Sequence, residues 1–495
     1  MQTKNVIIIG SGVAGMASAI RLALQGYTVK VFEKNSYPGG KLSAFEKDGY
    51  HFDEGPSLFT QPQNIEELFE LAGEPIEKYL SYQPVDIACK YFYENGKTVN
   101  AYTDAARFAE ELKEQANENS ANVINYLKNS GKVYENIGTV FVDHSLHKRK
   151  TWLHKRIIKA LSTVRYRYLF SSLHKHNSKK FTSPEAIQLF NRFATYNGSN
   201  PYKAPAMLSL IPHLEQNQGT FYPKGGMISI ANALYQLAKM KGVQFYFDTP
   251  VERIIYYEGR VSGVVVNGEN INADILVSNV DVYFTYKNLL RDATRAKKIL
   301  KQERSSSAVI FYWGIKKNFP ELQLHNIFFS KDYKKEFDSI FKARQLSDDP
   351  TVYINITAKM ETAQAPAGME NWFVMVNAPA NNGQDWALLK QNLRTNIISK
   401  LNRMLGIELE QLIVTEHIAD PVMIEDQTAS YMGSLYGTSS NSKLAAFLRP
   451  ANFTGTTKGL YFCGGSVHPG GGIPLCLKSA KIVSGLIREQ YKKNK

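Results

Sequence analysis

A short apolar segment followed by spaced glycines constrains the fold of this chain more than any other feature. Residues 6–9 are all valine or isoleucine, which is typical of a buried parallel strand. Gly10, Gly12 and Gly15 follow at once in a G-x-G-x-x-G pattern. Such glycines permit a tight turn, close approach of a diphosphate and close packing of the next helix on the strand. The pattern predicts a βαβ unit that binds a dinucleotide.

The residues after these glycines agree with that prediction. A helix is expected over residues 14–25, with its free N–H groups facing the phosphates. A second strand is expected over residues 27–32, and Glu33 follows at about the 20-residue spacing at which a carboxylate accepts ribose hydroxyls. The same carboxylate would repel a 2′-phosphate. FAD or NAD is therefore favoured over NADP.

A secretory signal peptide is the alternative interpretation of this segment. Lys4 precedes an apolar run, and residues 17–19 resemble a cleavage site. Arg21 and the glycines interrupt the run, so we favour the dinucleotide site. No other segment offers about 18 uninterrupted apolar residues, so no membrane-spanning helix is expected.

The composition is that of a globular protein with excess positive charge. The 495 residues are 43% hydrophobic and 21% charged, which favours a buried core and about three domain-sized units. The three cysteines, Cys89, Cys463 and Cys476, have no spacing typical of a disulfide framework or a metal site. A reducing cytoplasm and no metal are therefore expected. The net charge of +14 favours an anionic partner.

Much of the positive charge falls in residues 147–180, and no acidic residue lies between Asp143 and Glu185. Apolar residues recur there at helical spacing, at Leu153, Ile157, Leu161, Val164 and Tyr168. A basic helix with an apolar face is typical of a membrane interface, where each cation near anionic lipid contributes about 1 kcal/mol. A solvated helix packed on its own protein fits the pattern equally well. No nucleic-acid-binding module accompanies the charge, so nucleic acid is not expected as a partner.

Later segments are also expected to approach a ligand. Residues 37–41 and 50–57 contain glycines that permit close approach of the backbone. Aromatic, glycine and proline residues are dense over residues 190–202 and 221–227, which favours a loop that lines a cavity.

The end of the chain is expected to return to the same cofactor. A strand over residues 459–465 leads into a glycine-rich turn and a helix over residues 475–491. The open N–H groups and the helix dipole at this turn would stabilise negative charge on a reduced flavin.

The order of these elements indicates an α/β fold with a discontinuous FAD-binding Rossmann-type domain, a substrate domain of sheet and helices, and a basic helical insertion. The expected boundaries are residues 1–75, 215–299 and 450–495 for the FAD-binding domain, residues 76–103, 190–214 and 300–449 for the substrate domain, and residues 104–189 for the insertion.

Several motifs together resemble the bacterial phytoene desaturase family over essentially the whole chain. They are Gly10-Ser11-Gly12-Val13-Ala14-Gly15, Glu33-Lys34 with Pro38-Gly39-Gly40-Lys41, Phe52-Asp53-Glu54-Gly55-Pro56-Ser57, Asn197-Gly198-Ser199-Asn200-Pro201, Tyr222-Pro223-Lys224-Gly225-Gly226-Met227 and His468-Pro469-Gly470-Gly471-Gly472-Ile473-Pro474. General likeness is greatest to the branch that contains the 1-hydroxycarotenoid 3,4-desaturases. Lys41 is a departure, because related flavoproteins often have arginine there and lysine meets phosphate only as a point charge.

The resemblance implies a noncovalent FAD and a carotenoid substrate drawn from the membrane. The implied cofactor contacts are Gly10, Gly12, Val13, Ala14, Gly15, Glu33, Lys34, Gly40, Lys41, Gly55, Pro56, Ser57, Val251, Gly464, Gly465, Gly472 and Ile473. His468, Arg192, Asp143 and Tyr196 are candidate polar participants, none of them singled out as an essential acid or base. Residues 147–180 would form a membrane-facing lid, which places the enzyme in the cytoplasm against the inner face of the cell membrane.

The implied reaction is dehydrogenation of a carbon pair beside a polyene, in carotenoid biosynthesis. A hydride would leave for the flavin and a proton would leave the next carbon, and oxygen or a quinone would reoxidise the flavin. The expected substrate is a 1′-hydroxylated monocyclic carotenoid of the γ-carotene type, desaturated at C-3′,4′, and the alternative is early desaturation of phytoene. Two other classes stay open. A flavin amine oxidase shares the motifs, although no residue selects an amine, and a prenyl-lipid escort protein would bind no FAD.

Overall fold

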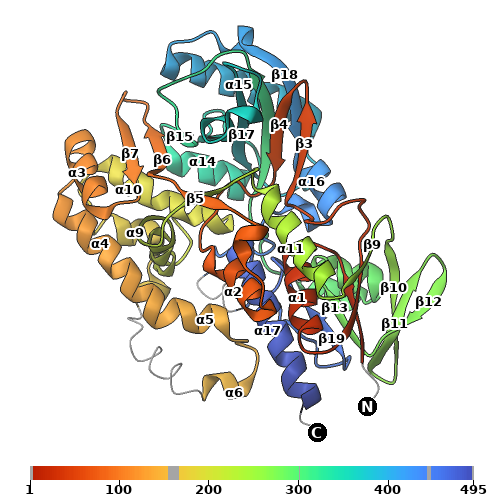
Figure 1. Ribbon diagram of the computed structural model, residues 1–495. Helices are drawn as coiled ribbons and strands as arrows, with labels where there is room; N and C mark the ends of the chain where they lie inside the picture. Colours follow the sequence, from red (N-terminus) through yellow and green to blue (C-terminus); the bar gives the residue numbers. More distant parts are fainter. Residues whose placement is uncertain (1–3, 154–166, 300, 443–447, 493–495) are drawn as a thin grey trace.

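The computed structural model describes residues 4–153, 167–299, 301–442 and 448–492 (Figure 1). A five-stranded parallel sheet in the order β19-β13-β1-β2-β9 organises one half of the molecule. Its strands are β1 (Asn5–Ile9), β2 (Thr28–Phe32), β9 (Gln244–Tyr246), β13 (Ile275–Ser278) and β19 (Leu460–Phe462). Because β1 lies between β2 and β13, segments far apart in sequence meet beside the first glycine turn.

The residues of β1 alternate between two covering layers. Ile8 packs under the helices α1 (Val13–Ala23), α2 (Gln63–Ala72), α11 (Ile228–Met240) and α17 (Ile473–Lys492). Ile7 and Ile9 pack on the other face against the antiparallel meander β10 (Val251–Tyr257), β11 (Arg260–Val266) and β12 (Glu269–Asn272). The continuous apolar run at residues 6–9 is explained by this burial on both faces.

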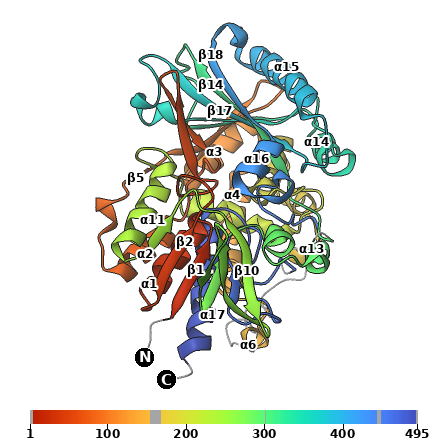
Figure 2. The ribbon, with the colours of Figure 1, turned by 90° about the vertical axis from the view of Figure 1, so that its right-hand side faces the viewer.

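A seven-stranded sheet in the order β18-β14-β17-β16-β15-β6-β7 forms the other half, shown above the parallel sheet in Figure 2. Its strands are β6 (Ile87–Phe92), β7 (Thr98–Tyr102), β14 (Ser307–Ile315), β15 (His325–Phe328), β16 (Val352–Ile356), β17 (Glu370–Ala378) and β18 (Ile413–Ala419). Helix α15 (Trp386–Leu405) covers one face through a core that includes Trp313 and Ile354. The opposite face, here the inner sheet face, carries Ile310, Tyr312, Phe373, Met375 and Tyr353.

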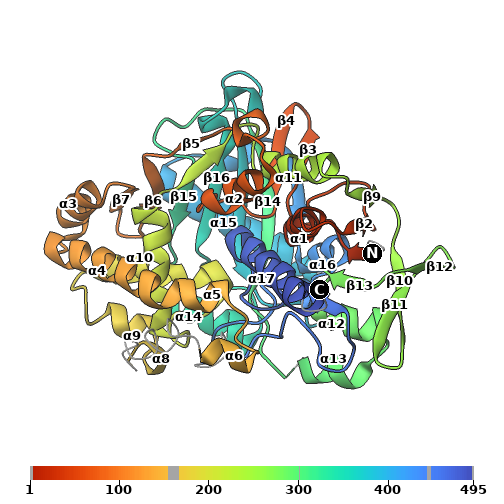
Figure 3. The same cartoon turned by 60° about the horizontal axis from the view of Figure 1, so that its bottom comes forward.

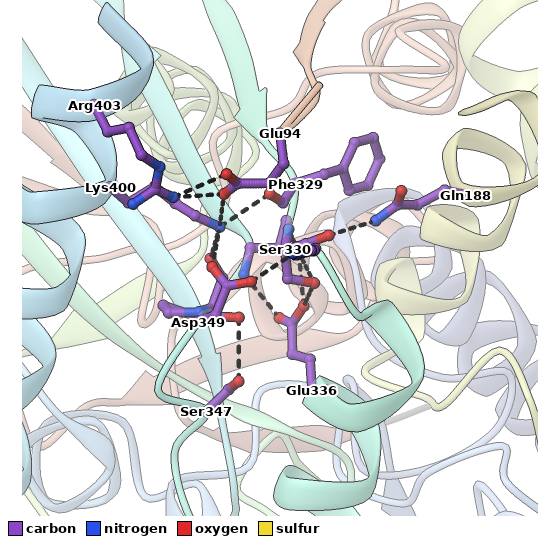
Figure 4. Close-up of polar contacts among 12 residues, drawn as sticks. Glu94, Gln188, Phe329, Ser330, Glu336, Ser347, Asp349, Lys400 and Arg403 are labelled. Atoms are coloured by element: carbon purple, nitrogen blue, oxygen red, sulfur yellow. Dashed lines mark hydrogen bonds and ion pairs between the residues drawn. The ribbon is translucent and has the colours of Figure 1, made fainter. Parts of the chain in front are cut away.

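A buried lysine anchors α15 to this sheet (Figure 4). Lys400 is 2% exposed, and its Nζ donates to the carbonyls of Phe329 (2.9 Å) and Pro350 (2.8 Å). The same ammonium pairs with Asp349 at 2.7 Å and with Glu94 at 3.5 Å. Each donor of the ammonium thus has an acceptor, so we interpret this network as structural.

Helices of the insertion begin at side-chain caps. Asp104, Asn119 and Ser183 each accept a hydrogen bond from a backbone N–H of the first turn. The insertion consists of α3 (Ala105–Ala116), α4 (Ser120–Val133), α5 (Thr139–Asp143), α6 (Arg149–Trp152), α8 (Arg167–Phe170), α9 (Leu173–Asn177) and α10 (Pro184–Asn191). Helix α5 lies against α17, as Figure 3 shows. Among the described residues, no helix is both long and apolar enough to cross a membrane.

Smaller elements connect these layers. Strand pairs are β3 (Ser43–Lys47) with β4 (Tyr50–Glu54), and β5 (Tyr82–Pro84) with β8 (Phe221–Pro223). Short helices are η1 (Ile76–Lys78), η2 (Tyr134–Gly138), η3 (Arg192–Asn197), η4 (Ala206–Leu210), η5 (His213–Asn217), α12 (Val282–Phe284), η6 (Thr285–Leu289), α13 (Ala293–Ile299), α14 (Tyr333–Asp338), η7 (Ser339–Ala343), η8 (Thr357–Lys359), η9 (Thr362–Gln364), η10 (Leu409–Gln411), α16 (Pro421–Thr428) and η11 (Tyr431–Gly433).

The prediction of a loop over residues 190–202 is wrong for residues 190–197, which are helical. Helix α10 runs to Asn191, and the 3₁₀ helix η3 continues to Asn197. Phe190 and Phe193 are buried in a core shared by the insertion helices and strands β6, β7 and β15. Their aromatic character therefore reflects core packing, which sequence composition does not distinguish from the lining of a cavity.

Candidate flavin and substrate site

The first glycine turn joins the end of β1 to α1. Gly10 has a φ of +96°, which glycine adopts readily. A Cβ on Gly15 would lie 2.1 Å from the carbonyl oxygen of Gly10. Val13 and Ala14 open α1, and no side chain caps its N-terminus, so the first N–H groups are available to a phosphate.

Glu33 lies at the end of β2 and reaches this turn. Its Oε2 accepts from the N–H (2.7 Å) and the hydroxyl (3.0 Å) of Ser11, and its Oε1 accepts from the N–H of Asn35 (3.0 Å). A carboxylate has about four lone-pair sites, so ribose hydroxyls can still donate to it. The backbone N–H of Thr249 donates to the carbonyl of Glu33 at 2.8 Å, which brings Val251 at the start of β10 to the same region.

The second and third glycine segments close on the first. Gly39 donates to the carbonyl of Ser11 at 3.0 Å, and a Cβ on Gly40 would meet the Cα of Gly12 at 3.3 Å. A Cβ on Gly55 would lie 1.9 Å from the carbonyl oxygen of Lys41. Pro56 and Ser57 follow Gly55 and are half-buried.

The two lysines predicted to contact the cofactor, Lys34 and Lys41, differ in their exposure. Lys34 is exposed, and its Nζ donates to the carbonyl of Asp426 at 2.5 Å. The Nζ of Lys41 donates to the carbonyls of Leu435 (2.9 Å) and Ser434 (3.5 Å). Burial lowers the pKa of Lys41, and Asp281 opposes that shift.

The last glycine segment lies between β19 and α17, beside Asn279. Gly464 has a φ of +103°, and a Cβ there would lie 2.7 Å from Oδ1 of Asn279. Gly465 follows it in the same turn. Gly472 has a φ of +101° with nothing within 4 Å of the space that a Cβ would fill, and Ile473 begins α17 there. Open backbone therefore faces the site at the N-terminus of a second helix.

Three polar side chains beside these segments lie outside the sequence prediction. Asn279 follows β13, and its amide fills the space beside Gly12, where a Cβ would lie 2.6 Å from Nδ2. Its place after a parallel strand is a signal that could have been used, because ligands bind at such strand ends. Arg304 pairs with Asp281 at 3.6 Å, and Arg449 donates to the carbonyl of Tyr436 at 2.9 Å. Both arginines follow irregular segments without a motif.

These buried cations increase the positive character of the site. Burial lowers the pKa of Arg449 to about 10, and nearby Arg304 acts in the same direction. The Nε of Arg304 is buried without a hydrogen-bond partner. The site thus combines the glycine segments, two helix N-termini with free N–H groups, Glu33 and these cations. This combination fits the diphosphate, ribose and ring of FAD.

The four polar candidates fall into two groups. Arg192 donates from Nη2 to both carboxylate oxygens of Glu215 at 3.0 Å, and the hydroxyl of Tyr196 donates to the same carboxylate. Burial acts to lower the pKa of Arg192, but Glu215 outweighs it and raises that pKa. Arg192 and Tyr196 thus form one buried unit.

The other two candidates lie near α17. The Nε2 of His468 donates to the carbonyl of His144 at 2.9 Å, and burial lowers the pKa of His468 to about 4. Asp143 pairs with Lys478 of α17 at 2.7 Å. The neutral imidazole therefore holds the end of α5 against the last glycine turn, which is a positioning contact.

The inner sheet face approaches the flavin segments. The hydroxyl of Tyr353 and the Oγ of Ser57 are 2.8 Å apart. Tyr312 and Phe373 lie beside Tyr353 on this face, and Met375 is half-buried against it. An apolar surface thus begins at the third glycine segment, as a long hydrocarbon substrate requires.

A surface cavity of about 770 Å³ lies elsewhere, between the insertion and the loop before α14. Its lining includes His174, Lys331, Asp332, Lys334 and Asp349, and none of the predicted cofactor residues. Its charged walls do not suit a polyene.

Known proteins resemble this chain over almost its whole length. A model of the family described as flavin containing amine oxidoreductase matches residues 13–488. The chain is 50% identical over 484 residues to a 1-hydroxycarotenoid 3,4-desaturase of Flavobacterium sp. (strain P99-3), covering 98% of this chain and 99% of the relative. It is 34% identical over 486 residues to a 4,4'-diapolycopene oxygenase of Methylomonas sp., covering 97% of each. Cyclohexylamine oxidase from Brevibacterium oxydans IH-35A shares the fold, with a TM-score of 0.63 at 16% identity over 99% of this chain and 100% of that chain.

The family match spans almost the whole chain and confirms the resemblance, the α/β fold and the FAD cofactor that the glycine motifs predict. An escort protein without FAD chemistry is therefore not supported. The chain belongs to the flavin containing amine oxidoreductase family and, within it, to the carotenoid desaturases, as an FAD-dependent oxidoreductase.

Proposed function

We propose that this enzyme desaturates the C-3′,4′ bond of a 1′-hydroxylated monocyclic carotenoid of the γ-carotene type. The observation that carries the proposal is the 50% identity to a 1-hydroxycarotenoid 3,4-desaturase over 98% of the chain. The early desaturation of phytoene is the alternative, and it requires the same cofactor and the same kind of apolar site.

In this proposal the cofactor accepts the hydride, and the protein holds the substrate and excludes water. Bound FAD supplies the acceptor for the hydride that leaves the carbon next to the polyene. The inner sheet face, through Tyr312, Phe373 and Tyr353, would hold the polyene beside the segment of Ser57 and exclude water from it. The FAD is held noncovalently in this proposal, and oxygen or a quinone reoxidises it.

A turnover assay with two substrates tests the proposal. Purified protein is incubated with FAD and liposomes that carry either a 1′-hydroxylated monocyclic carotenoid or phytoene, and products are separated with mass and absorbance detection. We expect a loss of two hydrogens and a red shift from the hydroxylated substrate alone. Coloured products from phytoene would instead make the enzyme an early desaturase, and no product from either would contradict both assignments.

We also propose that the enzyme works at the inner face of the cell membrane. Trp152, Leu153 and Phe170 are exposed, Leu153 by 76% and Phe170 by 62%, and Lys148 and Arg149 precede them. Apolar side chains next to cations are suited to a bilayer interface with anionic headgroups. Ile157, Leu161 and Val164, which extend this pattern in the sequence, lie outside the described residues.

The double variant Leu153→Asn and Phe170→Asn tests this proposal. Its binding to vesicles that contain anionic lipid should fall by about tenfold or more, because each apolar side chain removed from the interface contributes on the order of 1 kcal/mol. Co-sedimentation measures the binding, and Leu388→Asn is the control, since Leu388 is 55% exposed on the distant helix α15. Equal binding by the double variant and the control would refute this membrane face.

A further inference from the structure

A buried histidine at the start of β15 has a hydrogen-bond donor with no partner. The amide Nδ2 of Asn355 donates to the carbonyl of Leu324 (3.0 Å) and to Nδ1 of His325 (3.1 Å). The Leu324 carbonyl fixes the orientation of this amide, so Nδ1 accepts and the ring proton is assigned to Nε2. That Nε2 is buried without a hydrogen-bond partner. Burial, with the nearby Arg192 guanidinium, lowers the pKa of His325 to about 3, so the ring is neutral.

A second buried polar group, the hydroxyl of Tyr91, lies on the neighbouring strand β6. Strands β15 and β6 pair in parallel with Ile327 opposite Tyr91, so His325, two residues before Ile327, lies on the same face as Tyr91. The hydroxyl of Tyr91 is buried with no oxygen or nitrogen partner, and it interacts with the Cys89 thiol, whose pKa it helps to lower against the larger effect of burial. Unpaired polar groups are costly in a protein interior, so a polar ligand atom that accepts from Nε2 of His325 would stabilise this site.

This polar cluster is connected to the flavin segment. The Nδ1 of His325 is 2.8 Å from the hydroxyl of Tyr353, which is 2.8 Å from the Oγ of Ser57. In a 1′-hydroxylated substrate the oxygen is three covalent bonds of about 1.5 Å from C-3′, so it must lie within roughly 4 Å of the reacting bond. The group that binds this hydroxyl must therefore lie near the flavin segment, and the ring of His325 is joined to that segment through the hydroxyl of Tyr353.

We propose that the Nε2 of His325 donates a hydrogen bond to the tertiary hydroxyl oxygen of the carotenoid, with the hydroxyl of Tyr91 as its second partner. The inference rests on the proposed function and names the residues that would select the hydroxylated substrate. A site that bonds a substrate hydroxyl discriminates strongly against the analogue that lacks it, because its buried polar groups are then left unpaired.

Two substrates test this inference: the hydroxylated carotenoid and the same carotenoid without the hydroxyl. The quantity measured is the ratio of the first kcat/KM value to the second. His325→Phe and Tyr91→Phe should each lower the ratio by about 10- to 100-fold. His325→Gln should retain part of the ratio, because its amide nitrogen can take the place of Nε2. The controls are His176→Phe and Tyr126→Phe, which alter a half-buried ring and a buried ring in the insertion. FAD content verifies the fold of each variant.

The possible outcomes distinguish a failure of this inference from a failure of the proposed function. If the wild-type enzyme desaturates both compounds and His325→Phe and Tyr91→Phe leave the ratio unchanged, the inference is overturned and the desaturase assignment stands. If the wild-type enzyme desaturates neither, the proposed function fails, and tryptophan-fluorescence titration with the two compounds decides the inference. Weaker binding of only the hydroxylated compound by His325→Phe would then support it, and equal Kd values in wild type and variant would overturn it.

Discussion

A Gly15→Ala variant is expected to lose most of its affinity for FAD. The added Cβ would lie 2.1 Å from the carbonyl oxygen of Gly10, far inside van der Waals contact, and the obstacle is backbone. The turn must then open and move the N–H groups of α1 away from the diphosphate. We expect the affinity to fall by about 100-fold or more, or about 2.8 kcal/mol. Titration of the FAD-free protein with FAD, followed by flavin fluorescence, measures the change.

Gly485→Ala is the matched control for this variant. Gly485 also lies in a helix, α17, but nothing is within 4 Å of the space that its Cβ would fill. Alanine is favoured over glycine in a helix by about 1 kcal/mol, so this variant should bind FAD normally with unchanged or higher stability. A Gly15→Ala protein with the same FAD affinity as Gly485→Ala would refute the geometry of the first turn.

An Arg192→Met variant is expected to be the least stable of the single substitutions considered. Glu215 is 1% exposed, and both of its carboxylate oxygens accept from Nη2 of Arg192. Removing one partner of a buried ion pair leaves an uncompensated charge, at a cost of about 3–5 kcal/mol. Thermal unfolding of the FAD-loaded protein should show a clearly lower midpoint.

The double variant Arg192→Met and Glu215→Leu distinguishes a lost pair from lost packing. Replacing both charges by apolar groups of similar size is often close to neutral, so the double variant should recover much of the midpoint. A double variant as unstable as Arg192→Met would contradict the assignment of the cost to the unpaired carboxylate of Glu215.

The cofactor turn could be predicted from sequence because its determinants are local. The run at residues 6–9 and the glycines at 10, 12 and 15 specify a strand, a turn and a helix within a few residues of one another. The observed helix, Val13–Ala23, differs from the expected residues 14–25 only at its ends, where local signals are weakest.

The partners of the polar side chains could not be predicted in this way. Arg192 and Glu215 lie on two different short helices, η3 and η5, and no periodic pattern in the sequence marks the pair. His325 meets Asn355 and Tyr353 only through the register of β15 and β16. Such contacts depend on how distant segments pair, which a single sequence does not specify.

The most direct test of the account is a single turnover without oxygen. FAD-loaded protein is mixed anaerobically with the 1′-hydroxylated carotenoid, and flavin absorbance and product are measured together. We expect the flavin to be reduced, and one molecule of the desaturated carotenoid, two hydrogens lighter and without added oxygen, to form for each flavin reduced. A flavin that stays oxidised in the presence of the carotenoid, or a product that contains a new oxygen atom and forms only in air, would contradict it.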